Sequence, residues 1–72
     1  MLYGMKIGLT IEEAADYSGI GRDTLKKSID RGKLPSLRIG RKTIIRTDTL
    51  NRFMEANQGV DLMDIEQVRS VE

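Results

Sequence analysis

The feature that most constrains the fold of this 72-residue chain is a break at Gly19-Ile20-Gly21, which separates two short amphipathic segments. In the first segment, Thr10 and Glu13 have the spacing of a capping box, in which each side chain accepts a hydrogen bond from the other residue's backbone N–H. A helix of about two turns is therefore expected to begin after Thr10 and to end at Gly19. The lone hydrophobic residue Ile20 would fill the angle where the chain changes direction.

The second segment predicts another short helix, from Arg22 to Arg31. Leu25 and Ile29 are four residues apart, which is the spacing found on the buried side of an amphipathic helix. Gly32 suits a left-handed C-cap, and Pro35 prevents an early return to helix. The outward side of this helix carries the charged residues Arg22, Asp23, Lys26, Lys27 and Asp30.

The stretch after this proline alternates in the manner of a β-hairpin, and two turn lengths fit it. A two-residue turn at Gly40-Arg41 places Leu37 opposite Ile44. A three-residue loop that adds Lys42 places Leu37 opposite Ile45. We favour the longer loop, since the residues that share one face are then Leu37, Ile39, Thr43 and Ile45. The residues that point outward are then Arg38 and Ile44.

Two further elements complete the predicted domain. Residues 3–9 alternate between apolar and small or polar residues, which indicates a short strand despite two glycines. A third helix is expected to have Thr47 or Asp48 as its N-cap and to end at residues 57–59. Its apolar side would consist of Leu50, Phe53 and Met54.

The last residues mix acidic and apolar side chains. Leu62, Ile65 and Val68 recur at intervals of three, which allows a short amphipathic helix of marginal stability. Three possibilities stay open for this segment: it is disordered, it packs on its own domain, or it binds a protein partner. We expect one folded domain, residues 1–58, followed by an acidic tail, residues 59–72.

Together these elements predict a small α+β fold, a winged helix-turn-helix with about three helices and a β-hairpin wing.

The composition excludes several classes of function. The chain has no cysteine and no histidine, so the usual zinc ligands and the Cys–His and Ser–His catalytic pairs are missing. Because no paired carboxylates and no Gly-rich phosphate loop are visible either, we expect no enzymatic activity, no metal and no cofactor. Apolar runs are too short for a membrane span or an export signal, so a cytoplasmic protein is expected.

The net charge is only +1, but the charge is unevenly distributed. Between Arg22 and Arg46 there are nine basic residues and two acidic ones, whereas residues 60–72 hold four acidic residues and one basic one. The second helix and the Gly-Arg-Lys tip of the hairpin therefore present positive charge on neighbouring elements. This pattern favours a nucleic-acid surface over an ordinary solvated helix face.

A helix-turn-helix places its second helix in the major groove of DNA, with the N-terminal residues of that helix at base edges. An arginine at the tip of a thin hairpin can enter the minor groove. We therefore predict an interface for double-stranded DNA that consists of Arg22, Asp23, Thr24, Lys26, Lys27, Arg38, Arg41 and Lys42. Asp23 either orients the neighbouring lysines or accepts from a cytosine amino group.

Five short motifs stand in a specific order: Leu9-Thr10-Ile11-Glu12-Glu13-Ala14-Ala15, Gly19-Ile20-Gly21-Arg22-Asp23-Thr24-Leu25, Arg31-Gly32-Lys33-Leu34-Pro35, Arg38-Ile39-Gly40-Arg41 and Ile45-Arg46. Over residues 9–56 this order resembles the excisionase-type helix-turn-helix family, which is related to the mercury-resistance regulator superfamily of winged helices. The resemblance implies a DNA-bending accessory factor of site-specific recombination, encoded by a phage or integrative element. It fits a small phage-type transcription regulator equally well.

The sequence departs from this family pattern at three positions. Gly21 stands where serine is common, so the second helix lacks a side-chain cap. Ser28 replaces a usual apolar residue, and Ile44 replaces a polar or basic one.

The resemblance also implies protein partners. In similar recombination directionality factors the C-terminal segment often contacts the integrase, so an integrase or recombinase is an expected partner of the tail. Further copies of the protein on neighbouring DNA sites are also expected, because one helix and one wing contact few base pairs. A different class of function stays open, since winged helices also serve as protein-interaction modules. In that case the chain is an adaptor that acts on a recombinase.

Overall fold

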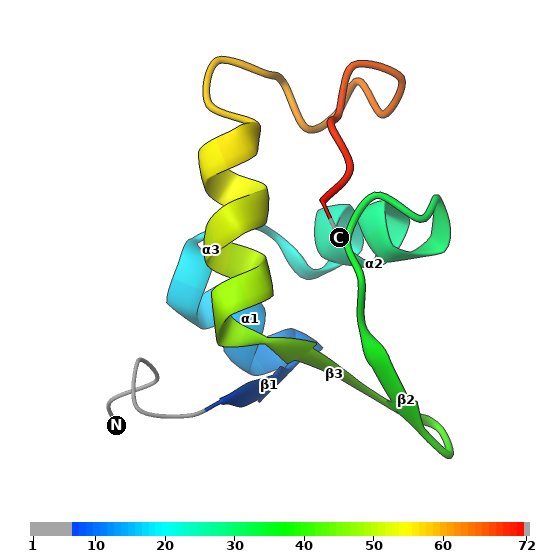
Figure 1. Ribbon diagram of the computed structural model, residues 1–72. Helices are drawn as coiled ribbons and strands as arrows, with labels where there is room; N and C mark the ends of the chain where they lie inside the picture. Colours follow the sequence, from blue (N-terminus) through cyan, green and yellow to red (C-terminus); the bar gives the residue numbers. More distant parts are fainter. Residues whose placement is uncertain (1–6, 72) are drawn as a thin grey trace.

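The computed structural model describes residues 7–71 (Figure 1). Its elements, in chain order, are β1 (Gly8–Thr10), α1 (Ile11–Ser18), α2 (Arg22–Asp30), β2 (Leu37–Ile39), β3 (Lys42–Arg46) and α3 (Thr47–Ala56). The three strands pair antiparallel in the order β1-β3-β2. This is the small α+β winged helix-turn-helix that the sequence predicts. Of the strand predicted at residues 3–9, residues 3–6 lie outside the described residues.

Local signals set the limits of α1 as predicted. The backbone N–H of Glu13 donates to Thr10 Oγ1 at 3.1 Å, and the backbone N–H of Thr10 donates to Glu13 Oε1 at 3.0 Å. Both halves of the capping box are therefore formed. The helix ends at Gly19, whose φ of 79° lies in the left-handed region that glycine adopts without steric cost.

The second helix also follows the prediction, with one correction to its buried side. It ends at Asp30, one residue earlier than expected, and Gly32 then takes a φ of 74°. Leu25 is fully buried, but the second buried residue is Ser28, whereas Ile29 is only half-buried. The core therefore lies on the side of α2 that carries residues 25 and 28, three positions apart along the helix.

The predicted hairpin register is wrong. Leu37 pairs with Ile44 and Arg38 with Thr43, so the turn is the two-residue Gly40-Arg41. Gly40 has a φ of 60°, and no other residue of the turn has a positive φ, as in a type II′ turn with glycine at its first central position. Leu37 and Ile39 consequently lie on the outer face of the sheet, where they are 55% and 64% exposed.

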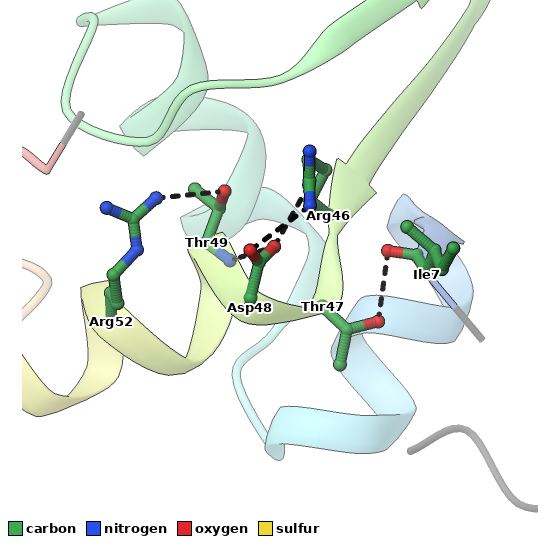
Figure 2. Close-up of polar contacts among 6 residues, drawn as sticks. All are labelled: Ile7, Arg46, Thr47, Asp48, Thr49 and Arg52. Carbon is green, nitrogen blue, oxygen red and sulfur yellow. Dashed lines mark hydrogen bonds and ion pairs between the residues drawn. The ribbon is translucent and has the colours of Figure 1, made fainter. Parts of the chain in front are cut away.

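The third helix begins at Thr47 with Arg46 at its N-cap, so neither Thr47 nor Asp48 is the cap that the sequence predicts. Thr47 instead ties α3 to the start of the sheet, because its backbone N–H and its Oγ1 both donate to the carbonyl oxygen of Ile7, at 2.8 and 3.2 Å (Figure 2). Asp48 accepts from the backbone N–H of Thr49 at 2.9 Å and from Arg46 Nε at 3.0 Å.

These contacts also affect the charge of Asp48. Desolvation raises its pKa, but the hydrogen bond and charge of Arg46, with smaller contributions from Thr49 and Arg52, hold the pKa below its ordinary value. The carboxylate therefore remains charged at neutral pH, and the first turn of α3 keeps a negative charge where the helix dipole favours one.

One hydrophobic core joins the sheet to the helices. Leu50 and Phe53 of α3 are fully buried, as predicted. The expectation that Met54 shares their buried side is wrong, because Met54 is 37% exposed. The buried apolar residues are Leu9, Ala14, Leu25, Leu34, Ile45, Leu50, Phe53, Ile65 and Val68.

Residues 60–71, which we name the C-terminal strap, pack on this core through Ile65 and Val68. The strap consists of turns rather than the short helix that the spacing allowed. Asn57 holds it in place: its side-chain amide donates to Arg69 O at 2.9 Å, and its Oδ1 accepts from Arg69 N at 2.6 Å. Of the three possibilities for this segment, the described residues show packing on the domain.

We predict that Asn57→Ala releases the strap. The substitution removes a buried amide that bonds to both backbone groups of Arg69, so the free energy of unfolding should fall by roughly 2–3 kcal/mol. Urea denaturation measures this loss, and hydrogen exchange should show reduced protection within residues 60–71. Gln58→Ala removes an exposed amide next to it and serves as the control. An Asn57→Ala protein with unchanged protection in the strap would contradict this role.

A second prediction concerns the buried Ser28, which is 1% exposed and whose Oγ has no hydrogen-bond partner among residues 7–71. Ser28→Ala should raise the free energy of unfolding by roughly 1 kcal/mol, because it removes an unsatisfied polar atom from the core. The midpoint of urea denaturation at unchanged m-value measures the gain. Ser70→Ala, at an exposed position, should leave the midpoint within error of the parent. A destabilised Ser28→Ala protein would show that the hydroxyl is satisfied.

Candidate nucleic-acid interface

The hairpin of β2 and β3, residues 37–46, forms the wing, and it projects from the body of the molecule (Figure 1). An open cleft of about 560 Å³ lies where the wing approaches the first turns of α2 and the start of α1. The residues that line the cleft are Thr10, Ile11, Glu12, Arg22, Asp23, Lys26, Arg38, Arg41, Lys42 and Thr43.

Positive charge dominates this cleft. Five of its residues are basic (Arg22, Lys26, Arg38, Arg41 and Lys42) and two are acidic (Glu12 and Asp23). All seven are exposed to solvent. Exposed cations on two adjoining elements can contact successive phosphates, and the arginine guanidinium can also donate two parallel hydrogen bonds to guanine.

The strand register brings Arg38 into the cleft. Arg38 pairs with Thr43, and Thr43 lies on the same face of β3 as the buried Ile45, since alternate residues of a strand share a face. The expectation that Arg38 points outward is therefore wrong, because the shorter turn reverses the faces of β2 relative to β3. Arg38 lies on the inner face, toward α2, and there it adds to the charge of the cleft.

The start of α2 is left open toward the cleft. Gly21 is its N-cap and offers no side-chain hydrogen bond to the first-turn N–H groups. A helix N-terminus carries partial positive charge from its unpaired N–H groups, which favours a nearby anion. This local field has the same sign as that of the basic side chains around it.

The structure brings together six of the eight residues predicted from the sequence. Two others lie outside the cleft. Thr24 is half-buried, and its Oγ1 lies 3.8 Å from the Sδ of Met63 in the strap. Lys27 is exposed, but it follows Lys26 by about 100° of helix and so points to a different side of α2.

The cleft also contains residues that sequence reasoning missed, and Glu12 is the most notable of these. Its Oε1 lies 3.5 Å from Arg22 Nη1, in an ion pair that joins α1 to α2. The capping box fixes where α1 begins, and Glu12 lies within its first turn. That signal predicts the helix start, but the contact with Arg22 depends on how the two helices pack.

Within residues 7–71, no group of three or more acidic residues gathers as a metal site would require. In the same part of the chain, no helix is both long and apolar enough to cross a membrane.

Comparison with known proteins gives a match at the level of family. The model of a helix-turn-helix domain family matches residues 9–58, which extend from β1 through α3 and stop before the strap. No curated protein and no solved structure matches the chain.

The geometry of the cleft predicts an order of effects for substitutions on DNA binding. Lys26→Ala and Arg41→Ala should each weaken binding about fivefold, because each removes a cleft cation without opening the core. Lys27→Ala should weaken binding less. Arg52→Ala, on the exposed part of α3, removes the same charge away from the cleft and serves as the control. Gel-shift titrations measure these affinities, and equal losses in all four variants would rule out the cleft as the interface.

Proposed function

The chain belongs to the helix-turn-helix domain family, and we propose that it binds double-stranded DNA in the cleft between α2 and the wing. The observation that carries this proposal is the gathering of five basic side chains from these two elements around one open surface. Under this proposal the protein acts by binding and catalyses no reaction. Residues 1–58 form the DNA-binding unit, and residues 59–72 form an appended acidic segment.

The proposed docking follows from the positions of the charges. The first residues of α2, Arg22 and Asp23, face the base edges of a major groove, as in other helix-turn-helix domains. Lys26 and Lys27 contact the phosphates along the groove. Arg41 and Lys42 at the wing tip reach the adjacent backbone or minor groove, where a narrow groove attracts arginine.

The proposed role is that of an excisionase-like accessory factor, which bends DNA to direct site-specific recombination. The order of short motifs in the sequence supports this role, and so does the small size of the interface. One short helix and one wing reach only a few base pairs, so specific action calls for several copies on neighbouring sites and for bending of the DNA. A transcription regulator with the same module is the alternative, favoured if the protein binds one site without bending it.

A recombinase is the proposed protein partner of the strap. The strap presents Asp61, Asp64 and Glu66 to solvent, and the exposed Met63 lies among them. The orange segment that carries these residues lies at the opposite end of the molecule from the wing tip (Figure 1), so a partner can contact this segment while DNA occupies the cleft.

We predict a steep salt dependence of DNA binding. If Lys26 and Lys27 of α2 and the basic residues of the wing, Arg38, Arg41 and Lys42, contact phosphates, the logarithm of the association constant should fall with the logarithm of salt concentration at a slope of roughly −4 to −5. Gel shifts or fluorescence anisotropy on a labelled duplex at several salt concentrations provide the slope. A slope near zero, or no binding, would favour a protein-interaction module instead.

The accessory role has its own test. Circular-permutation gel shifts on a natural site should show a bent complex, and footprints should extend over repeated sites that fill cooperatively. Sedimentation of the free protein should show a monomer, because copies assemble on DNA. A stable dimer that forms a straight complex at one site would contradict the accessory role and leave DNA binding intact.

A further inference from the structure

Glu12 places a carboxylate at the edge of a cleft whose other features attract anions. Its Oε1 lies 3.5 Å from Nη1 of Arg22, and the two side chains are 79% and 63% exposed. Glu12 comes from the first turn of α1 and Arg22 from the first residue of α2, so the pair connects the two helices of the turn on the side that lines the cleft.

The stability of the fold does not explain why a carboxylate occupies position 12. The capping box of α1 uses Glu13 and Thr10, so Glu12 is not needed to begin the helix. An ion pair this exposed contributes little to folding, since water and salt screen both charges. An acidic residue in the first turn of a helix adds roughly 0.3–1 kcal/mol at an exposed position, and salt screens this contribution as well. On a surface that binds a polyanion, the same carboxylate repels every phosphate that approaches.

That repulsion has a different effect on the two ways in which Arg22 can contact DNA. A phosphate contact brings negative charge close to Glu12, whereas a contact with guanine O6 and N7 brings a neutral base edge. The guanidinium has five N–H donors in a planar fork, so it can remain paired with one carboxylate and still donate to a base. Glu12 repels a phosphate and orients the side chain of Arg22. Both effects favour contact of Arg22 with a base over contact with a phosphate.

We propose that Glu12 is a specificity-determining residue, which positions Arg22 for a base edge by keeping it from the phosphate backbone. This proposal rests on the DNA-binding function proposed above. Glu12 therefore lowers the affinity for DNA in general while it raises the preference for the correct sequence. Asp23 also lies in the cleft, but the ion pair to Arg22 assigns this role to Glu12.

The test compares Glu12→Gln with the parent on two duplexes of equal length. One duplex is selected from a random pool by the parent protein, and the other is a scrambled version of it. Glu12→Gln keeps the shape of the side chain and removes its charge. It should bind the scrambled duplex about fivefold more tightly, and its salt slope there should steepen by about 0.9, because Arg22 gains a phosphate. The preference for the selected duplex should fall by about fivefold or more.

Two further variants separate this role from a general effect of charge. Glu66→Gln makes the same change of net charge on the exposed strap, and it should leave the preference and the slope unchanged. In an Arg22→Ala background, Glu12→Gln should no longer alter the preference between duplexes, because Glu12 acts through Arg22.

The possible results distinguish failure of the inference from failure of the function. If the parent does not bind duplex DNA in a salt-dependent manner, the proposed function fails and this inference fails with it. If the parent binds but Glu12→Gln behaves like Glu66→Gln, the specificity role is wrong and DNA binding stands. An unchanged effect of Glu12→Gln in the Arg22→Ala background would also overturn the proposed positioning.

Discussion

The pairing of Leu9 with Ile45 is the contact on which the rest of the structure depends. Both residues are fully buried, and they face each other across β1 and β3. Because alternate residues of a strand share a face, burial of Ile45 also places Thr43 on the inner face, and the two-residue turn at Gly40-Arg41 pairs Arg38 with Thr43. The core and this turn together determine which residues of the wing face α2, and the composition of the cleft follows from them.

The parts of the fold that sequence could predict are those set by nearby residues. The capping box of Thr10 and Glu13 and the left-handed Gly19 define α1 without reference to the rest of the chain. The hairpin register could not be predicted in the same way. Counting apolar residues on one face favoured the longer loop, but Leu37 and Ile39 lie on the outer face of the wing and stay exposed. Because the apolar residues of β2 bury little surface, the geometry of the turn at Gly40 decides the register of the hairpin.

Long-range packing explains the remaining differences between the predicted and the observed structure. The spacing of Leu25 and Ile29 indicates which side of α2 is apolar, but tertiary packing buries Ser28 and leaves Ile29 only half-buried. The Asn57 contact with Arg69 joins residues twelve positions apart and has no sequence signature. The charged side of the cleft was more predictable, since Arg22, Lys26 and Arg41 need only be exposed. Their common orientation toward one cleft, and the presence of Glu12 among them, required the packing of α1, α2 and the wing.

The contacts that support α2 and the basic side chains that α2 directs into the cleft lie on different sides of the helix. Thr24 contacts Met63 of the strap, and Lys33, in the loop after the helix, accepts a 3.2 Å hydrogen bond from the backbone N–H of Val71. Residues 22 and 26 lie nearly opposite residue 24 around the helix, because two positions correspond to about 200° of rotation. Support therefore comes from one side, and the basic side chains line the cleft on the other. A helix of only nine residues is too short to be stable alone, so α2 needs support from tertiary contacts. Under the proposed function, these contacts must leave the cleft side of α2 free. The strap meets this requirement because it contacts α2 at Thr24 and the following loop at Lys33, away from Arg22 and Lys26.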